Sequence, residues 1–229
     1  MADSRSRAQE AVAQGRVTVS GFPATKPDRL VAASEPIEIA GPPPPYVGRG
    51  GEKLEAALRE FSVDVRGKRC LDVGSSTGGF TDCLLQHGAS QVVAVDVGHG
   101  QLDWSLRNDP RVVVMERTDI RDVDGTTIGR VEVVTVDVSF ISLRTVLPSI
   151  DEIAGDADVI ALVKPQFEVG RSKVPKGGVV RDGTLQAQAV ADVVAAAERY
   201  GFVCRAEMPS PLTGARGNKE FLVLLGRDR

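Results

Sequence analysis

Two short segments of this chain have the residue types and the spacing of a nucleotide-type cofactor site. The first, Cys70 to Phe80, is an apolar run that ends in Asp-x-Gly-x-x-x-Gly-Gly. The second, Val92 to Asp96, is an apolar run that ends in an acid. Glycines in a strand-to-helix turn let a ligand approach the backbone closely, and an acid at the end of the next strand can accept hydrogen bonds from both ribose hydroxyls. The two segments therefore predict a site for a ligand that carries a ribose.

The spacing of the glycines indicates which type of cofactor the site would bind. The dinucleotide fingerprint Gly-x-Gly-x-x-Gly is absent, and the turn is similar to the looser one of S-adenosylmethionine-dependent methyltransferases, whose cofactor has no pyrophosphate. We expect Asp96 to bind the ribose and Asp119 to bind the adenine amino group. An ordinary glycine-rich turn is the alternative for the motif, and helix capping is the alternative for Asp119. The residues expected to contact S-adenosylmethionine are Asp72, Gly74, Ser76, Gly78, Asp96 and Asp119.

Charged side chains follow the apolar runs that come later in the chain. Asp137 and Lys164 end two neighbouring predicted strands, and the ends of parallel strands converge on one cleft. Lys53 lies in a glycine-rich segment before the first core strand, and Glu220 begins the last predicted strand. Both residues can reach the same cleft. A surface ion pair without function is the alternative for Asp137 and Lys164, but four charged residues around one cleft favour catalysis.

The elements that must position these residues alternate between strand and helix. Hydrophobic spacing predicts strands over residues 69–73, 91–95, 111–115, 131–137, 159–164, 202–208 and 220–225. It predicts helices over residues 52–61, 80–87, 102–106, 143–153 and 185–200. Such alternation is typical of an α/β fold with a mainly parallel, doubly wound sheet. We therefore expect a Rossmann-like, seven-stranded methyltransferase sheet, with an antiparallel strand at the end of the order because the last two strands have a short connection.

A smaller module precedes this core. Residues 3–13 have helical spacing with Asp3 or Ser4 as the cap, and residues 16–21 and 37–39 are predicted strands. The four consecutive prolines at 42–45 supply no backbone donors, so they mark a stiff boundary. The predicted organisation is a partial module at 1–40, a Pro-rich linker at 41–48 and a catalytic domain at 49–229.

Composition argues against several classes of protein. The formal net charge of −3 over 229 residues gives no global attraction to nucleic acid, so any RNA contact must come from local basic segments. The 3 cysteines are widely separated and favour buried thiols over a disulfide, and 2 histidines are too few for a His/Cys metal site. No signal sequence and no apolar run of bilayer length is visible. We expect a cytoplasmic protein that binds no metal and no membrane.

Six motifs occur in order along the chain, at residues 49–54, 72–80, 96–102, 137–143, 163–168 and 177–182. Together they resemble the TlyA family, the hemolysin A proteins, which are ribosomal RNA 2'-O-methyltransferases with an FtsJ-like catalytic domain. The resemblance runs from about Asp3 to Leu225. It implies S-adenosylmethionine as the cofactor, ribosomal RNA or ribosomal subunits as the partner, and methylation of cytidine ribose in 16S and 23S ribosomal RNA.

The resemblance also implies a catalytic Lys-Asp-Lys-Glu tetrad, whose matching positions are Lys53, Asp137, Lys164 and Glu220. A ribose hydroxyl is a poor nucleophile at neutral pH, so methyl transfer gains from a group that takes or stabilises its proton. Lys164 is expected to act as the general base or alkoxide stabiliser, and Asp137 to orient it. Lys53 and Glu220 are expected to position the acceptor nucleotide.

The amino-terminal module resembles an S4-like RNA-binding module through residues 4–8 and 15–21. The first helix of such a module should precede Met1, so we expect a truncated module or a late start codon. Candidate phosphate contacts lie in this module and in the basic loop 170–181 near Lys164, where Arg181 is a further cation. Ordinary solvated charges are the alternative in both places. The candidates for RNA binding are Arg5, Arg7, Arg16, Lys26, Arg171, Lys173 and Lys176.

Three other functions compete with the one that the resemblance implies. A methyltransferase for a small molecule or a protein would use the same cofactor site, but the paired lysines and the glycine-rich segment 49–54 disfavour it. A non-catalytic RNA-binding protein would fit the incomplete module, but the intact tetrad disfavours it. A secreted pore-former would need export and a membrane-inserting segment, and neither is visible.

Overall fold

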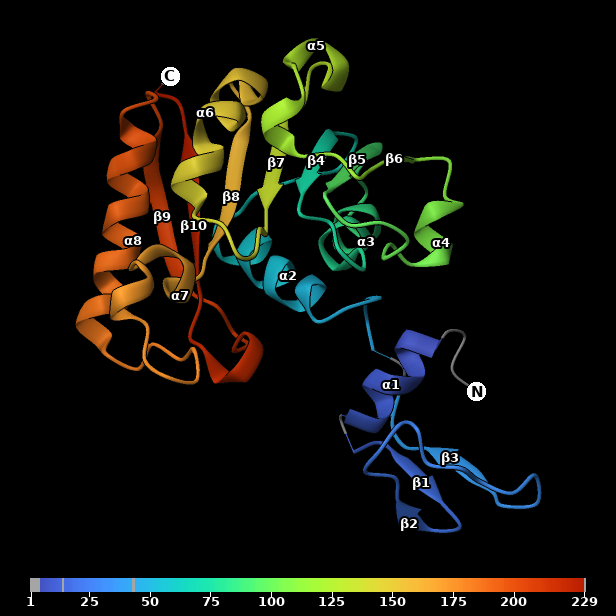
Figure 1. Ribbon diagram of the computed structural model, residues 1–229. Helices are drawn as coiled ribbons and strands as arrows, with labels where there is room; N and C mark the ends of the chain where they lie inside the picture. Colours follow the sequence, from blue (N-terminus) through green and yellow to red (C-terminus); the bar gives the residue numbers. More distant parts are fainter. Residues whose placement is uncertain (1–4, 14, 43, 229) are drawn as a thin grey trace. The chain divides into compact units, whose positions relative to one another are not determined.

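The computed structural model describes residues 5–13, 15–42 and 44–228 (Figure 1). The chain divides into two compact units, Met1–Pro45 and Tyr46–Arg229. Within the described ranges, no helix is both long and apolar enough to cross a membrane.

Seven strands of the described residues form one sheet in the carboxy-terminal unit, in the order β6-β5-β4-β7-β8-β10-β9. β4, β5, β6, β7 and β8 pair in parallel, whereas β10 is antiparallel to both of its neighbours. The expected Rossmann-like α/β sheet is confirmed. The strands are β4 (Arg69–Val73), β5 (Gln91–Asp96), β6 (Val112–Glu116), β7 (Val133–Val136), β8 (Asp158–Val163), β9 (Val203–Pro209) and β10 (Phe221–Gly226).

The sequence predicted an antiparallel strand at the end of the sheet. In the structure the antiparallel strand is β10, and it is not the edge strand. The connection after β9 folds back as a hairpin, and β10 inserts between β8 and β9. β9 therefore takes the edge position. This insertion places the residue before β10, Glu220, beside the end of β8.

Helices cover both faces of the sheet, with α6 and α8 on one face and α2 and α3 on the other (Figure 1). The two core clusters follow the alternation of side chains along each strand. Leu71 and Val73 of β4 pack in the α6 and α8 cluster, whereas Cys70 packs in the α2 and α3 cluster. The helices are α2 (Gly50–Glu60), α3 (Gly79–Gln86), α4 (Trp104–Arg107), α5 (Gly125–Ile128), α6 (Leu143–Ala154), α7 (Pro165–Glu168) and α8 (Gly183–Glu198), with 3-10 turns η1 (Ile120–Asp122), η2 (Arg171–Lys173) and η3 (Ala215–Gly217).

Side-chain caps fix where several helices begin. Asp182 accepts hydrogen bonds from two backbone amides at the start of α8, and Ser142 accepts one at the start of α6. Asp124 caps α5 in the same way. The short helices α5 and α7 were not predicted, because four residues are too few to show a helical repeat of hydrophobic side chains.

The amino-terminal unit consists of α1 (Arg5–Ala13) and a small antiparallel sheet, ordered β2-β1-β3. Its strands are β1 (Val17–Val19), β2 (Phe22–Pro23) and β3 (Ile37–Ile39), of which β2 was not predicted. The proposed caps Asp3 and Ser4 lie outside the described residues. Its described core is small and consists of Ala11, Val17, Val19 and Ala24.

A contact between glycines sets the start of α2, the helix that carries Lys53. A Cβ atom on Gly79 of α3 would lie 3.0 Å from the amide nitrogen of Gly51 and 3.1 Å from the carbonyl oxygen of Gly48. A Cβ atom on Gly51 would overlap the ring of Tyr46. The two helix starts therefore approach each other at a distance that side chains would prevent.

We expect Gly51→Ala to lower the free energy of unfolding by about 1–3 kcal/mol, because the added methyl group overlaps the packed Tyr46 ring. Urea denaturation measures this difference. Gly183→Ala is the matched control, since a Cβ atom there meets nothing within 4 Å, and it should be neutral. Equal stability of the two variants would contradict the packing argument.

Candidate active site

The candidate site forms where several strands end at one edge of the sheet. The register pairs Val73 of β4 with Val95 of β5 and with Val136 of β7. Val163 of β8 pairs with Phe221 of β10. The residues one step beyond this edge are Gly74, Asp96, Asp137, Lys164 and Glu220. Residues far apart in sequence are thus brought to neighbouring positions.

The four residues of the expected tetrad form two ion pairs at this edge. Lys53 Nζ lies 2.5 Å from Glu220 Oε2, and Lys164 Nζ lies 2.5 Å from Asp137 Oδ1. Lys164 Nζ also donates a hydrogen bond to Ser139 Oγ at 2.8 Å. Three of the four side chains are at least nine-tenths buried, and that of Asp137 is 23% exposed. A surface ion pair without function would be solvated, so the burial argues against that alternative.

Backbone contacts hold the segments that carry these side chains. A Cβ atom on Gly214 would overlap the carboxylate of Glu220, so the loop before β10 closes directly over this acid. Arg49, at the start of α2, donates a hydrogen bond to the carbonyl oxygen of Thr213 at 2.9 Å. The segments that carry Lys53 and Glu220 are therefore linked twice, by the ion pair and by this bond.

On the other side, Glu168 of α7 joins the segment after Lys164 to the start of α6. Its carboxylate accepts hydrogen bonds from the hydroxyl of Ser142 at 2.5 Å and from the amide of Leu143 at 2.8 Å. Because the loop from Asp137 to Ser142 leads into α6, this carboxylate keeps both members of the Asp137 and Lys164 pair in place.

A cavity of about 400 Å³ opens beside these pairs, a size that suits a small-molecule site. Four of the six residues expected to contact the cofactor line it, namely Gly74, Ser76, Asp96 and Asp119, and so does Asp137. Gly74 has φ 85°, and a Cβ atom there would overlap the carbonyl oxygen of Asp137. Only glycine fits this position, which keeps the turn close to Asp137.

Asp96 organises the wall of this cavity. Its Oδ2 accepts a hydrogen bond from the amide of Ser76 at 2.8 Å, and its Oδ1 accepts one from the amide of Gly98 at 2.6 Å. A carboxylate has about four lone-pair positions, so each oxygen retains one for a further donor. The free acceptor positions of Asp96 and the glycine turn therefore fit a ligand with a ribose diol.

Asp119 lines the cavity but also caps η1, which is the alternative that the sequence left open. Its carboxylate accepts hydrogen bonds from the amide and the guanidinium of Arg121. These hydrogen bonds, those from the guanidinium above all, keep the pKa of Asp119 below its usual value. The carboxylate is thus ionised and largely occupied by Arg121.

Two of the expected cofactor contacts do not line the cavity. Gly78 has φ 98° and begins α3, and a Cβ atom there would overlap the side chains of Leu102 and Leu106. Asp72 is fully buried, and it accepts hydrogen bonds from the hydroxyls of Thr81 at 2.6 Å and Thr135 at 2.9 Å. Asp72 therefore joins β4 to α3 and β7 behind the glycine turn.

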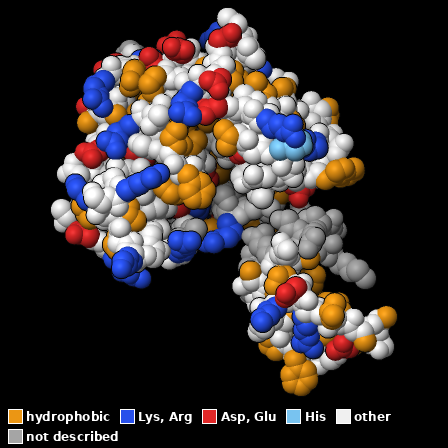
Figure 2. Space-filling model, in the orientation of Figure 1, with side chains coloured by type: hydrophobic (Ala, Val, Ile, Leu, Met, Phe, Trp, Pro, Cys, Tyr) orange, Lys and Arg blue, Asp and Glu red, His pale blue; other side chains and the backbone are white. Residues whose placement is uncertain are grey.

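Sequence reasoning missed an exposed aromatic side chain at the mouth of the cavity. Phe140 is 92% exposed, has φ 66° and lines the cavity. Its ring centroid lies 5.4 Å from that of Phe167. In Figure 2, exposed hydrophobic atoms lie over the loop between β7 and α6, next to Lys and Arg side chains. The signal available was a phenylalanine between a predicted strand and a predicted helix, in the segment Asp137 to Ser142, outside any hydrophobic repeat.

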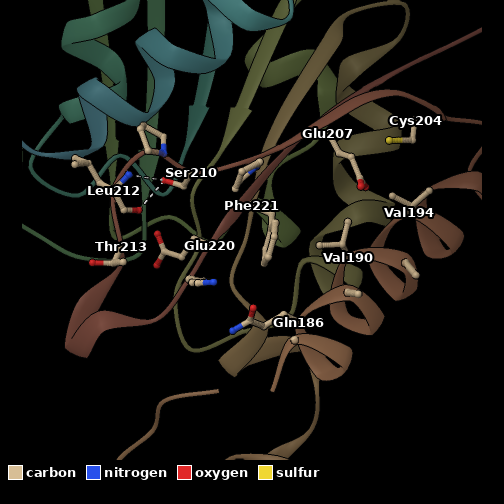
Figure 3. Close-up of a pocket in the computed structure, with 16 residues that line it drawn as sticks. Gln186, Val190, Val194, Cys204, Glu207, Ser210, Leu212, Thr213, Glu220 and Phe221 are labelled. Carbon is tan, nitrogen blue, oxygen red and sulfur yellow. Dashed lines mark hydrogen bonds between the residues drawn. The ribbon is translucent and has the colours of Figure 1, made fainter. Parts of the chain in front are cut away.

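A second cavity of about 690 Å³ lies between α8 and the β9–β10 hairpin. Figure 3 shows Glu220 and Thr213 at one end of it and Val194 and Cys204 toward the other. Its walls are mostly apolar, with Val190 and Phe221 between the two ends. Glu220 thus stands between this groove and its partner Lys53.

The expected RNA contacts lie in both units. Arg171, Lys173 and Lys176 are exposed, and their loop is anchored by Asn218, which accepts from the amide of Val180 and donates to the carbonyl of Gly178. Arg181 is exposed at the end of this loop, and Lys26 is exposed in the amino-terminal unit. The guanidinium of Arg16 binds the carbonyls of Ala40, Gly41 and Pro42. The side chains of Arg5 and Arg7 lie outside the described parts of the structure.

No group of three or more His, Cys, Asp or Glu side chains that could hold a metal ion occurs in the described part of the chain. The cysteines are Cys70, Cys83 and Cys204, all free thiols. Burial raises the pKa of Cys70 and of Cys83 to about 12, so both remain protonated.

Comparison with known proteins relates the carboxy-terminal unit to one enzyme family. Residues 46–227 match the family model described as FtsJ-like methyltransferase. The chain is 48% identical over 228 residues to the 16S/23S rRNA (cytidine-2'-O)-methyltransferase TlyA of Mycobacterium tuberculosis. This match covers 98% of this chain and 85% of that protein. It is 41% identical over 223 residues to Hemolysin A of Brachyspira hyodysenteriae, covering 96% of this chain and 92% of that protein.

One solved structure is similar over nearly the whole chain. It is described as "Putative hemolysin from Streptococcus thermophilus", with a TM-score of 0.82 and 40% sequence identity. The match covers 99% of this chain and 84% of that one.

The burial of Asp72 leads to a prediction about stability and pH. Burial, and then the charge of Asp137, raise the pKa of Asp72 to about 6, although the two threonine hydroxyls oppose the shift. Between about pH 4 and pH 6 the folded state therefore holds a proton that the unfolded chain has lost, and the free energy of unfolding falls as the pH rises. We expect the stability of the wild type to fall by about 3 kcal/mol relative to Asp72→Asn over this window, and to stay level above it.

Urea denaturation of both proteins from pH 4 to pH 8 measures the difference. Asp109→Asn is the control with the opposite sign, because Arg111 lowers the pKa of Asp109 and its contribution is lost as the pH falls. A difference between wild type and Asp72→Asn that does not vary with pH would show that Asp72 ionises normally.

Proposed function

Because the chain belongs to the FtsJ-like methyltransferase family, we propose that it transfers the methyl group of S-adenosylmethionine to the ribose 2'-hydroxyl of cytidine in 16S and 23S ribosomal RNA. The observation that carries this proposal is the pair of buried ion pairs, Lys53 with Glu220 and Lys164 with Asp137, beside a cavity lined by Asp96. The 48% identity to a ribosomal RNA methyltransferase supports the substrate. Such a substrate places the reaction in the cytoplasm.

The cofactor residues are assigned by their place in the cavity. Asp96 has lone pairs left to accept hydrogen bonds from the two ribose hydroxyls. The turn from Gly74 to Ser76 lies beside Asp137, and we assign it to the methionine part. Asp119 lines the same cavity, and we assign it to the adenine amino group. Asp72 and Gly78 act on the cofactor through the turn that they hold in place. When bound, S-adenosylmethionine supplies an electrophilic methyl group on a sulfonium.

The lysine and acid pairs are assigned to the acceptor. As the 2'-oxygen bonds to the methyl carbon and the carbon–sulfur bond breaks, the hydroxyl proton must leave the oxygen. Lys164 takes this proton if its amine is neutral, or as an ammonium it stabilises the alkoxide that forms when solvent takes the proton; Asp137 and Ser139 fix the position of the lysine. Lys53 and Glu220 hold the acceptor ribose in line with the methyl group.

The RNA contacts combine charge and stacking. The loop 170–181 contributes Arg171, Lys173 and Lys176, which are suited to phosphate contacts near Lys164. The exposed ring of Phe140 is suited to stacking on an unpaired base at the mouth of the site. We assign the amino-terminal unit, with Arg5, Arg7, Arg16 and Lys26, to an S4-like RNA-binding module.

The direct test of this function is to map ribose methylation on purified 30S and 50S subunits after incubation with the protein and S-adenosylmethionine. Methylated cytidine ribose in both ribosomal RNAs is expected. Methylation of one subunit alone would narrow the substrate, and methylation of neither would contradict the proposal and favour a small-molecule or protein acceptor or a non-catalytic protein.

We expect Lys164→Ala to lower the rate of methyl transfer by about 10²–10⁴-fold, because the acceptor loses its proton-handling group. Calorimetry should show nearly unchanged affinity for S-adenosylmethionine, since Lys164 does not line the cofactor cavity. Lys68→Ala, at the opposite end of β4, is the matched control and should remain fully active. Substantial turnover by Lys164→Ala would remove this lysine from its assigned role.

We expect the triple variant in which Arg171, Lys173 and Lys176 are changed to Gln to bind RNA with a weaker salt dependence. The slope of log K against log salt concentration should fall in magnitude by about 2–3, because up to three phosphate contacts are lost. A filter-binding titration at several salt concentrations measures the slope. The matched control changes Arg59, Lys68 and Arg199, which lie at the far ends of α2, β4 and α8, to Gln. If the two triple variants share one slope, the loop does not contact phosphate.

A further inference from the structure

Glu116, the last residue of β6, makes three hydrogen-bonding contacts that neither the cofactor motif nor the tetrad includes. Its carboxylate accepts from the amide of Gly100 at 2.9 Å and from Nη2 of Arg107 at 2.5 Å, and it lies 3.1 Å from Nδ1 of His99. The side chain is only 11% exposed. The carboxylate of Glu116 is therefore contacted by three residues, His99, Gly100 and Arg107.

The donors belong to the loop that forms one wall of the cofactor cavity and to the helix that follows it. The loop 97–101 lies in the connection between β5 and α4, and its residues Val97, Gly98 and Gln101 line the cavity. Asp96 and Glu116 are register partners at the ends of two adjacent parallel strands. Asp96 accepts from the amide of Gly98, so the two acids hold alternate amides of one loop.

Glu116 is also linked to the glycine turn, through its contact with Arg107 of α4. Arg107 belongs to α4, and the side chains of Leu102 and Leu106 lie where a Cβ atom of Gly78 would be. The amide of Asp103 also donates to the carbonyl of Thr77 at 3.1 Å. Glu116 is therefore connected to both loops that enclose the cavity, one directly and one through Arg107.

We propose that Glu116 is a positioning residue for the cofactor, which fixes the loop 97–101 in the conformation that binds S-adenosylmethionine and so sets the affinity for it. This inference rests on the proposed function. Glu116 itself does not line the cavity, so it acts through the loop and through Arg107 rather than by contact with the cofactor.

The charge of Glu116 is part of this role. The hydrogen bond from Gly100, and then those from Arg107, lower the pKa of Glu116 to about 2, so the group stays ionised throughout the physiological range. His99 and Arg107 are the titratable groups that contact it. A glutamine keeps one acceptor for the amide of Gly100 but loses the charge that holds Arg107.

The test compares cofactor affinity with turnover. For Glu116→Ala we expect the dissociation constant for S-adenosylmethionine, measured by calorimetry, to rise by about tenfold or more, and for Glu116→Gln to rise less. At saturating cofactor, kcat and the affinity for RNA should stay within about twofold of the wild type, because the tetrad is untouched. Trp104, the single tryptophan of the chain and 76% exposed next to this loop, gives a fluorescence signal for the same titration.

Two further variants make the comparison specific. Arg107→Gln should raise the dissociation constant, and its combination with Glu116→Gln should add little, because both remove one interaction. Asp109→Asn is the matched control, since Asp109 and Arg111 form a similar pair at 2.7 Å that does not contact the loop 97–101. It should leave cofactor binding unchanged.

Cofactor affinity equal to wild type in the Glu116→Gln, Glu116→Ala and Arg107→Gln variants would overturn the positioning role and leave the proposed function intact. A fall in kcat at saturating cofactor with unchanged affinity would also overturn it. If the wild type itself bound no S-adenosylmethionine, the proposed function and this inference would both fail. Should Glu116→Ala not fold, the Glu116→Gln and Arg107→Gln variants decide the outcome.

Discussion

The burial of two lysine and carboxylate pairs at one edge of the sheet is the constraint on which the rest of this structure depends. Each buried ion loses hydration at a cost of several kcal/mol unless a partner is fixed close to it. The glycine contact between α2 and α3 fixes the start of the helix that carries Lys53, and the insertion of β10 beside β8 fixes Glu220. Glu168 fixes the segments on both sides of the second pair. Chemistry, more than stability, explains why the fold maintains such an arrangement.

The proposed cofactor cavity and the ion pairs are joined through the backbone. Gly74 lies so close to the carbonyl of Asp137 that no side chain fits between them, and Asp137 both lines the cavity and pairs with Lys164. A methyl donor bound in this cavity and a methyl acceptor held at Lys164 would therefore lie on either side of Asp137. The carboxylates of Asp96 and Glu116 hold the opposite wall through backbone amides. Rigid elements thus define both sides of the space in which transfer would occur.

Much of this architecture could be predicted from the sequence, because buried parallel strands are apolar runs and α6 and α8 carry clear helical repeats. β4 was predicted with its observed bounds, and the tetrad followed from the resemblance. The place of β10 could not be predicted, since hydrophobic patterns do not encode strand order. Asp72 was assigned to the cofactor because an acid near a glycine turn has the same sequence signal whether it faces the cavity or the interior. Glu116 was missed because its partners are one backbone amide, a histidine of the same loop and an arginine on a four-residue helix.

The insertion of β10 between β8 and β9 also has a consequence for biosynthesis. The ribosome makes the chain from its amino terminus, so the strands with the glycine turn and with Asp137 and Lys164 emerge well before Glu220. A nascent chain that ends just after β8 contains both Asp137 and Lys164, but it contains Lys53 without Glu220. The second pair forms only when β10 pairs with β8, because this pairing brings Glu220 beside the end of β8. The proposed site is therefore incomplete until β10 has been synthesised and paired with β8.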